Sequence, residues 1–322
     1  MKYLFQWIKI FLCALLMQST HFLFSQTKTG VLVMAHGGSP TWEASVKNAV
    51  NPVKQKYLTE IAFGMADPMT MQEGINNLEK QGVNTIVVVP LFISSHSPIF
   101  RQAEYLLGLR KELADEPIIM SHGAPSNTGS FSNDHSHGSS SSGYSGETEA
   151  QTTLDPVVTK SQIILVKPLD ADSLVAAILY ERIQEFSKDP QKETIILVAH
   201  GPDSDSDNKG WLKNLDSLAK QVERRQMLLK KDSFQNIFTA TVRDDANKNV
   251  YNEAKEQLRL KVQTAGKGTT VIVVPVVLAT GGIEKGIQLR LEGLNYVWVN
   301  KALLPHENIT KFIENAVMTQ IK

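Results

Sequence analysis

Cysteine is almost absent from this chain, and charge of neither sign predominates. The single cysteine among 322 residues is Cys13, near the N-terminus. The rest of the chain can therefore form neither a disulfide nor a zinc–thiolate site, and any metal must be bound by histidine, carboxylate or carbonyl groups. Lysine plus arginine and aspartate plus glutamate both number 33, without a basic block. This balance argues against a nucleic acid partner.

Long apolar runs are missing too, apart from a short one in residues 1–26. This segment begins with Lys2, has its apolar centre at residues 10–17 and ends on Ser25-Gln26. A positive start, a short apolar centre and a small residue at the end are typical of a secretory signal peptide, here cleaved after Ser25. We therefore expect a periplasmic or otherwise extracytoplasmic protein with no stable membrane span after cleavage. The alternative is an uncleaved N-terminal anchor, although the apolar centre is short for a spanning helix.

The rest of the chain repeats one pattern twice. Each half contains three apolar segments in the same order: one that ends in a His-Gly turn, one that ends in proline, and a third that precedes an amphipathic helix. Near-continuous apolar runs indicate strands buried on both faces, as in parallel sheets covered by helices. The pattern predicts an α/β fold of two tandem doubly wound parallel-sheet domains, at residues 27–190 and 191–322. The matching segments are 30–37 and 194–201, 85–91 and 270–276, and 163–169 and 296–303, with helices at 174–186 and 309–321 and with Trp42 and Trp211 in comparable places.

Residues 121–159 interrupt the first half with a segment rich in serine and glycine. Such a composition cannot bury enough apolar surface to offset its ordering entropy, so we expect a disordered insertion. It carries His122, His135 and His137, with Asp134 beside the last two. Imidazoles near a carboxylate suit a weak, exchangeable divalent-metal collector. The alternative is a solvated loop whose histidines have no role.

Two histidines follow apolar strands of the first half. His36 ends the segment 30–36, and His96 lies in the turn after the strand that closes at Pro90. In a doubly wound sheet, ligands bind beyond the carboxyl ends of the strands, so both turns are expected at one crevice. Two imidazoles across an open cleft can hold a divalent metal and leave coordination positions for incoming ligands.

These segments resemble the signatures of the class II chelatases, the sirohydrochlorin cobalt and iron chelatases of the cobalamin and sirohaem pathways. The resemblance rests on residues 33–39 and 88–96, and it extends to Ala66-Asp67-Pro68 and Lys167-Pro168-Leu169. It implies the long, two-repeat form of the family, with the tetrapyrrole between the halves and with His36 and His96 as metal-handling residues. It also implies a divalent metal ion as substrate, Co²⁺ or Fe²⁺ with Ni²⁺ also compatible, and no organic cofactor. The chain accordingly has no glycine-rich phosphate-binding loop.

The chain departs from the family pattern in two places. Related sequences often carry an acidic residue where this chain has residues 63–65, so a carboxylate is missing there unless Asp67 or Glu60 substitutes. The second half keeps His200, as a contact to the substrate or as a structural relic, but it has residues 279–282, Ala-Thr-Gly-Gly, where His96 would recur. We therefore expect one working metal site, with the second half as the other wall of the cleft.

Other charged residues permit two interpretations. The acidic run 203–207 would help to recruit cations or would form a solvated loop. Arg101 and Arg290 would pair with substrate carboxylates if they face the cleft, and would otherwise be surface charges. His306 follows Pro305 at a predicted helix start, where we expect a structural role.

Three functions remain open on the sequence. The first is a tetrapyrrole metal chelatase that inserts Co²⁺ or Fe²⁺ into sirohydrochlorin, with His36 and His96 binding the metal and accepting pyrrole protons. The second is an exported carrier that binds metal or tetrapyrrole without turnover, which the signal peptide and the incomplete second half favour. The third is an extracytoplasmic α/β protein whose duplication is only architectural.

Overall fold

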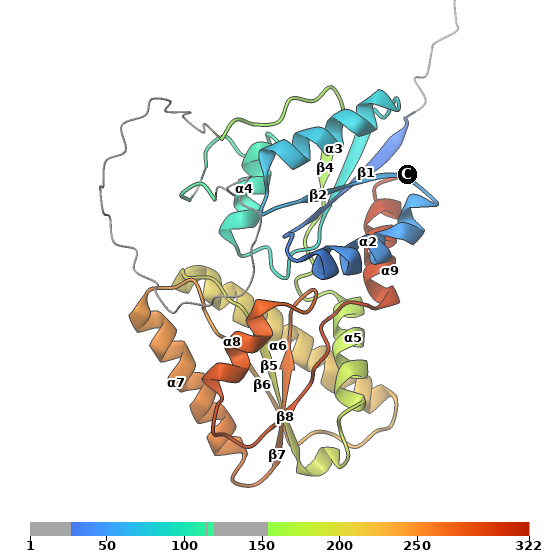
Figure 1. The fold of residues 1–322 in the computed structure, drawn as a ribbon. Helices are drawn as coiled ribbons and strands as arrows, with labels where there is room; N and C mark the ends of the chain where they lie inside the picture. Colours follow the sequence, from blue (N-terminus) through green and yellow to red (C-terminus); the bar gives the residue numbers. More distant parts are fainter. Residues whose placement is uncertain (1–26, 114, 119–153, 322) are drawn as a thin grey trace, which may run out of the picture.

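The computed structural model describes residues 27–113, 115–118 and 154–321, and the predicted signal peptide lies outside them. The fold consists of two four-stranded sheets in which every neighbouring pair of strands is parallel (Figure 1). The strand orders are β2-β1-β3-β4 and β6-β5-β7-β8, the same order in each half. This confirms the predicted fold class of two doubly wound parallel sheets. The strands are β1 (Thr29–Ala35), β2 (Leu58–Phe63), β3 (Thr85–Pro90), β4 (Gln162–Leu165), β5 (Glu193–Ala199), β6 (Asn236–Thr241), β7 (Thr270–Pro275) and β8 (Val297–Trp298).

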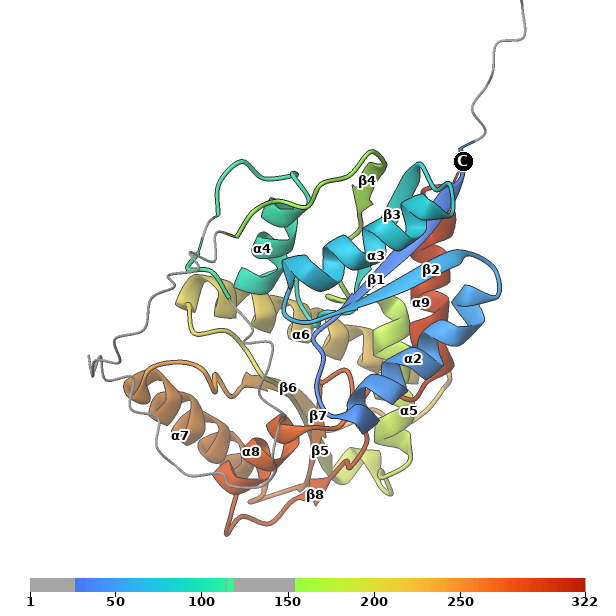
Figure 2. The ribbon, with the colours of Figure 1, turned by 45° about the horizontal axis from the view of Figure 1, so that its top comes forward.

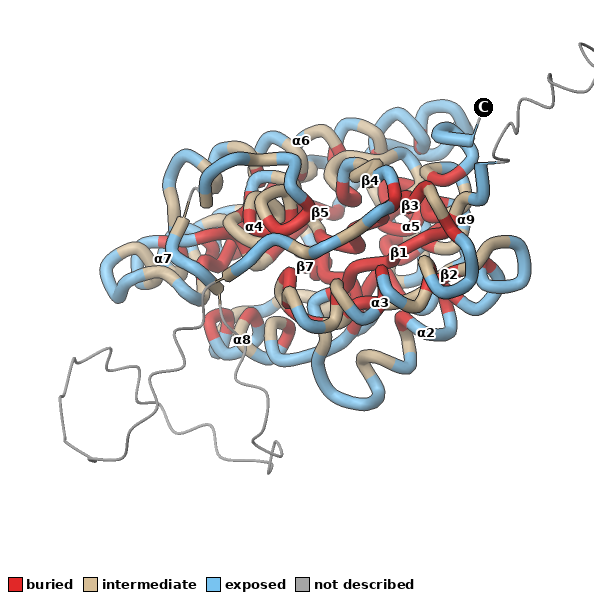
Figure 3. The backbone as a smooth tube through the Cα atoms, turned by 90° about the horizontal axis from the view of Figure 1, so that it is seen from above, coloured by how far each residue is buried: buried red, intermediate tan, exposed pale blue. Residues whose placement is uncertain are grey.

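Helices cover both faces of each sheet. In the first half they begin at sharp N-terminal signals, because Ser39, Asp67 and Ser97 each cap a helix and each is followed by proline at the first helical position. The central strands are buried between the helices, whose outer surfaces are exposed (Figure 3). The helices are α2 (Pro40–Lys54), α3 (Pro68–Lys80), α4 (Pro98–Leu106), α5 (Ser173–Gln184), the 3₁₀ turn η1 (Pro190–Lys192), α6 (Asp205–Leu228), α7 (Lys248–Ala265), α8 (Gly282–Arg290) and α9 (Glu307–Met318).

The last helix of each half packs on the other half. Helix α9 contacts α2 and β3 of the first sheet, and α5 contacts α6 and β7 of the second. Thr310 of α9 donates its hydroxyl proton to the carbonyl of Ala49 in α2 at 2.7 Å. Figure 1 shows the red C-terminal helix beside α2, at the first sheet rather than at its own. The sheets therefore follow the two predicted repeats, whereas the covering helices α5 and α9 cross between them.

This crossing produces one core shared by the two halves. Strand β1 points Val31 and Val33 into a cluster that also contains Ile195 and Leu197 of β5 and residues of α2, α5, α6 and α9. The opposite face of each sheet has its own smaller cluster, under α3 and α4 in the first half and under α7 and α8 in the second. Helix α6 runs between the halves, below α4 and the first sheet (Figure 2). It therefore lies where it can contact loops of both.

Residues 154–159, the end of the predicted insertion, are described and are attached to the first half. The amide side chain of Gln72 pairs with the backbone of Val158 through two hydrogen bonds of 2.8 and 2.7 Å. One carboxylate oxygen of Glu79 accepts four hydrogen bonds from residues 159–161. Burial opposes ionisation of Glu79, but these donors outweigh it and lower its pKa. The segment 154–159 thus belongs to the packed first half, where we had expected a disordered excursion.

Candidate functional site

The two predicted metal-handling histidines lie beyond the carboxyl ends of adjacent strands. His36 comes directly after β1, and His96 lies in the loop between β3 and α4. Strands β1 and β3 are neighbours, in a register that places Met34 opposite Pro90. Both histidines are exposed. They therefore lie at the same edge of the first sheet, where a doubly wound fold binds its ligands.

His36 is held in a tight turn that defines which ring nitrogen is free. Its Nδ1 lies 2.9 Å from the carbonyl oxygen of Gly37, which has a φ of +83° that favours glycine. A carbonyl only accepts, so in the neutral imidazole Nδ1 carries the proton of this hydrogen bond and Nε2 keeps its lone pair. The Trp42 ring lies tilted beside the imidazole, with centroids 6.4 Å apart. Nε2 is thus the atom of His36 that can bind a metal or accept a proton.

The backbone of the His96 loop is fixed by hydrogen bonds within the first half. The His96 amide donates to Ser94 Oγ at 3.1 Å, and the Ser95 amide donates to Asp170 Oδ1 at 2.7 Å. Asp170 follows β4, and its φ of +40° is in the left-handed region. The loop that carries His96 is therefore tied to the turn after the next strand of the same sheet.

The second half completes this support through α6. The Trp211 indole donates to the backbone carbonyl of His96 at 2.6 Å. Asn214 donates to both Ser94 Oγ and Asp170 Oδ1, at 3.1 and 2.8 Å. The His96 ring itself lies against Gly210 of α6. His96 is thus positioned by both halves of the chain.

His200 occupies in the second half the place that His36 has in the first. It follows β5, is partly exposed, and lies 3.4 Å from an Asp245 carboxylate oxygen through Nε2. The residue six positions after Pro275, as His96 is after Pro90, is Gly281. A Cβ atom on Gly281 would lie 3.8 Å from Trp42 Cδ1. The second half thus presents one histidine at its edge and a glycine in the loop where the first half has its second.

Comparison with known proteins supports the predicted family. The CbiX family model matches residues 30–113. The sirohydrochlorin cobaltochelatases of Saccharolobus islandicus and Saccharolobus solfataricus are each 34% identical over 82 residues. This match covers 25% of the chain and 64% of those relatives' length.

Residues 30–113 therefore resemble the CbiX family, and they are called the CbiX-family region below because they match that model.

Solved chelatase structures resemble the chain over most of its length. SirB from Bacillus subtilis, solved with Fe³⁺, has a TM-score of 0.56 at 16% identity, over 90% of this chain and 94% of that structure. CbiX, described as the terminal enzyme of sirohaem biosynthesis in denitrifying bacteria, has a TM-score of 0.50 at 12% identity, over 91% of this chain and all of that structure, 100%. At these identities the likeness shows the fold. The CbiX-family region thus supplies three of the four strands of the first sheet, β1, β2 and β3, in a chelatase-like two-sheet fold.

Neither carboxylate proposed to replace the missing one is free at the site. Asp67 of the CbiX-family region is the N-cap of α3, is buried, and accepts from the Thr70 amide at 2.9 Å. Glu60 lies in the middle of β2, where its Cβ faces Gly74 of α3. Asp67 serves the helix end, and Glu60 lies within the strand, away from its carboxyl end.

The acidic run after His200 is engaged by arginines from two directions. Arg101 of α4, in the CbiX-family region, binds Asp207 and Asp115, and their hydrogen bonds, that to Asp115 foremost, raise its pKa. Arg243 binds Asp205 at 2.8 Å and the carbonyls of residues 202 and 203. The run thus contributes two ion pairs, and the pair of Arg101 with Asp207 bridges the halves.

Arg290 and His306 also have structural roles. Arg290 is 3% exposed, forms an ion pair with Asp244, and lies over the Tyr251 ring at 4.1 Å from its centroid. Like Arg101, it is already paired within the protein. His306 caps α9, accepting from the Asn308 amide at 3.1 Å through Nδ1, as expected for a helix start.

Across residues 27–113, 115–118 and 154–321, no group of three or more histidine, cysteine, aspartate or glutamate side chains is arranged to hold a metal ion. The remaining histidines predicted to collect metal, His122, His135 and His137, lie outside these ranges. No helix in the same part of the chain is long and apolar enough to cross a membrane.

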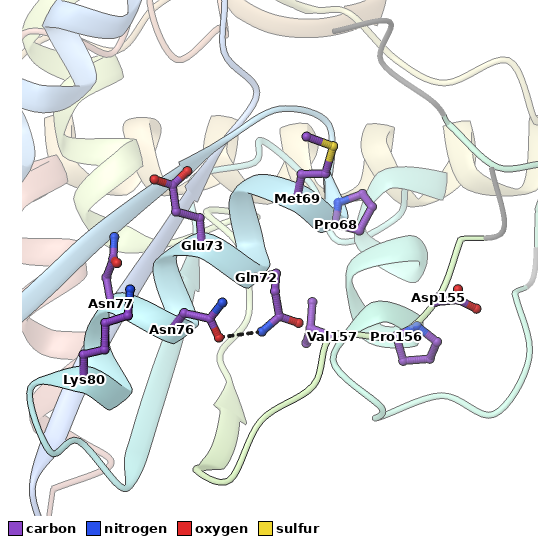
Figure 4. A pocket seen from close by; sticks show the side chains of 10 residues that line it. All are labelled: Pro68, Met69, Gln72, Glu73, Asn76, Asn77, Lys80, Asp155, Pro156 and Val157. Carbon is purple, nitrogen blue, oxygen red and sulfur yellow. Dashed lines mark hydrogen bonds between the residues drawn. The ribbon is translucent and has the colours of Figure 1, made fainter. Parts of the chain in front are cut away.

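Two pockets in the described part of the chain are lined by residues other than the site histidines. One of about 550 Å³ is bounded by α3 and residues 155–157, next to the Gln72 hydrogen bonds (Figure 4). Another of about 660 Å³ lies by the amino ends of β5 and β6 and by α7. Burial lowers the pKa of Lys261 in this second pocket, where its ammonium donates to the Thr239 carbonyl at 2.6 Å.

Sequence reasoning missed Gly210, Asn214 and Glu284. Gly210 and Asn214 support His96. The sequence feature that could have indicated them is their spacing, which places them with Trp211 on one face of the helix. Glu284 is buried at the start of α8, where burial raises its pKa although hydrogen bonds, including one from the Gly281 amide, oppose the shift. Its signal was its position three residues after a helix-start glycine, typical of a capping carboxylate.

Proposed function

We propose that the chain is a metal chelatase that inserts Co²⁺ or Fe²⁺, with Ni²⁺ also compatible, into sirohydrochlorin. The observation that carries this proposal is the placement of His36 and His96 beyond adjacent strands, both exposed, inside the region that matches the CbiX family. Relatives named sirohydrochlorin cobaltochelatases support this choice of substrate. The metal is a substrate, and the proposed reaction uses no organic cofactor.

Metal insertion requires a base as well as a ligand. As M²⁺ enters the ring centre, two pyrrole N–H protons leave, and two N–H bonds give way to bonds with the metal. A neutral imidazole can bind the metal or accept a proton because its pKa lies near neutral pH. His36 offers Nε2 for either task, since its Nδ1 is engaged by the Gly37 carbonyl. His96 is assigned the second imidazole, on the loop that α6 supports.

The second half is proposed to form the other wall of the tetrapyrrole site. His200 lies at the corresponding edge of the second sheet and is partly exposed, which suits a substrate contact. The proposal assigns it no metal, because Gly281 stands where the second histidine would recur.

The site of action is proposed to be extracytoplasmic, on the strength of the N-terminal pattern of residues 1–26. The order of a positive start, an apolar centre and a small residue is the feature that supports export. Expression of the full chain followed by cell fractionation and N-terminal sequencing tests this. A cytoplasmic product that retains Met1 would contradict it.

The direct test follows metal insertion by visible absorbance, using purified protein, sirohydrochlorin and each of Co²⁺, Fe²⁺ and Ni²⁺. The wild-type chain should produce the metallated spectrum with at least one metal. His36→Ala and His96→Ala should each slow the reaction by about a hundredfold or more, the range found for general acid–base groups. His306→Asn, which keeps a good helix cap away from the edge, should leave the rate unchanged. A wild-type chain inactive with all three metals would contradict the proposal.

A carrier without turnover is the second candidate, favoured by the glycine at position 281. Calorimetry distinguishes it from the enzyme. Tight binding of Co²⁺ or sirohydrochlorin, without any product spectrum when both are present, would support the carrier. Product formed over many turnovers would exclude it.

A further inference from the structure

We infer that α6 of the second half is a positioning platform for His96, with Gly210 as the seat on which the imidazole rests. This rests on the proposed function for its meaning, since it concerns how one of the two proposed metal-handling groups is oriented. Gly210 touches neither substrate nor metal in this proposal. It acts through His96.

One face of α6 makes all of these contacts. Asp207, Gly210, Trp211 and Asn214 follow the spacing i, i+3, i+4 and i+7, which places them along one side of a helix. Asp207 accepts two hydrogen bonds from Arg101, and Gly210 lies against the ring of His96. Trp211 donates one hydrogen bond to the carbonyl of His96. Asn214 donates two, one to Ser94 and one to Asp170. The stripe therefore follows the segment from Ser94 to Arg101 from end to end.

Gly210 is required for space. Its backbone is helical and is not among the positive-φ residues of the described chain, so no backbone strain calls for glycine. A Cβ atom built on it would lie closer than 3.0 Å to three atoms of the His96 ring: Cγ, Nδ1 and Cδ2. Real Cβ atoms do not approach other atoms that closely, so any larger residue must displace the ring. The ring occupies the volume that a side chain at position 210 would fill.

The two kinds of support act on different parts of His96. Trp211 holds the loop backbone, Asn214 holds the side-chain oxygens of Ser94 and Asp170, and Gly210 receives the ring. The other groups that bear on the loop, Ser94 and Asp170, hold its amides. With both the backbone and the ring located, the imidazole loses much of the rotamer freedom of an exposed side chain. Such outer support typically contributes ten- to hundredfold to metal affinity.

Gly210→Ala tests the seat. Alanine forms helices better than glycine, and the ring can swing away because His96 is exposed, so the melting temperature should stay the same or rise. Co²⁺ affinity and the insertion rate should nevertheless fall, each by about tenfold or more. The matched control is Gly286→Ala, inside α8, where the atoms nearest to a Cβ would be the side-chain ends of Arg290 and Asp244, at 3.2 and 3.4 Å. This control should leave Co²⁺ affinity and the insertion rate unchanged.

A double-mutant comparison separates positioning from a general structural effect. In a His96→Ala background, Gly210→Ala should cause no further loss of affinity or rate, because the ring it displaces is gone. An equal loss in both backgrounds would overturn the inference. So would wild-type Co²⁺ affinity and insertion rate in the single Gly210→Ala variant.

A readout independent of chemistry covers the case in which the proposed function fails. Nuclear magnetic resonance of the ¹⁵N-labelled histidines, assigned by His96→Ala, reports the environment of the ring without metal or substrate. The His96 ring signals should shift in Gly210→Ala and stay in place in Gly286→Ala. Unshifted signals would overturn the seat even if the chain is an active chelatase, and shifted signals in an inactive chain would sustain it.

Discussion

Because α9 packs on the first sheet, a substitution in α9 should destabilise the first half. Two separately folded repeats would not show this effect. Ile313 of α9 is fully buried, at 0% exposure, in the cluster that also contains Val46 and Val50 of α2 and Val89 of β3. Ile313→Ala should therefore destabilise the first half, although α9 ends the second repeat along the chain. Loss of a fully buried isoleucine side chain costs about 2–5 kcal/mol, depending on how far the site can collapse.

Native-state hydrogen exchange can assign this loss to a half. A loss of about 3 kcal/mol lowers the protection of an amide by more than about a hundredfold. We expect a decrease of this size in β1 and β3 as well as in β5 and β7. Leu258→Ala in α7 is the control, since Leu258 is equally buried but belongs to the outer cluster of the second half. The loss of amide protection in β1 and β3 that exceeds the loss caused by Leu258→Ala measures how much the contact of α9 stabilises the first sheet.

The refuting result is specific. If Ile313→Ala lowers protection in β5 and β7 but leaves β1 and β3 within about 0.5 kcal/mol of the wild type, the error expected for independent sites, then α9 does not stabilise the first sheet. The shared core would then be a contact without energetic consequence. The two halves would behave as separate folding units.

Three further substitutions test other parts of the fold. Although burial opposes ionisation of Glu79, the hydrogen bonds from residues 159–161 lower its pKa. They therefore stabilise the fold above its unfolded pKa, and this stabilisation is lost as pH falls through the folded pKa. Glu79→Gln should remove this pH dependence of the free energy of unfolding, measured in urea. It should also lower that free energy at neutral pH by about 1 kcal/mol, after allowance for solvent screening. Burial raises the pKa of Glu284, so its contribution to stability falls as pH rises through the folded pKa. Glu284→Gln should therefore raise the melting temperature at neutral pH. A lower melting temperature would show that the hydrogen bond from the Gly281 amide to the charged carboxylate outweighs the cost of burial. Arg182→Ala leaves the carbonyls of residues 302 and 305 without their donor and should lower the free energy of unfolding by about 2–4 kcal/mol in urea; a change under about 0.5 kcal/mol would show that water replaces it.

The central strands could be predicted from the sequence because they are buried on both faces. Their segments, at residues 30–36, 85–90, 194–199 and 270–275, are runs of β-branched and other apolar residues without alternation. Two of the four edge strands, β2 and β6, were missed. Both contain polar residues, such as Thr59, Glu60 and Asn236. An edge strand is covered less completely than a central one, so it tolerates polar residues, and its apolar pattern is weaker. The third segment of the second half was predicted as 296–303, but only Val297–Trp298 pairs as a strand.

The partners of the helices could not be predicted. Amphipathic patterns at 174–186 and 309–321 indicated α5 and α9, and both helices exist within a few residues of those bounds. A hydrophobic face states that a helix is buried and does not state which sheet it covers. The crossing of both helices depends on contacts between residues more than a hundred positions apart, such as Thr310 with Ala49.

The same limit applies to the site. The edge on which His36 and His96 lie followed from parallel strands and from the rule that ligands bind beyond their carboxyl ends. The residues of the second half that support His96 could not be predicted from the sequence. Glycine has a low helix propensity, and the sequence alone gives no reason for Gly210 within a helix. A glycine within a long helix indicates that a neighbouring group needs the space of a side chain. Which group needs that space is known only once the His96 loop is placed against the helix.

The asymmetry between the halves can be traced to these same facing surfaces. In the first half, the loop after β3 presents the ring of His96 to a glycine, Gly210, in the helix that follows His200. In the second half, the equivalent loop presents a glycine, Gly281, to the ring of Trp42 in the helix that follows His36. A large side chain meets a glycine in both contacts, in opposite directions, but only the His96 contact is too close for a Cβ atom, since a Cβ atom on Gly281 would lie 3.8 Å from Trp42. A histidine and its seat are therefore one unit divided between the repeats, and the half without the second histidine contributes the surface that orients it.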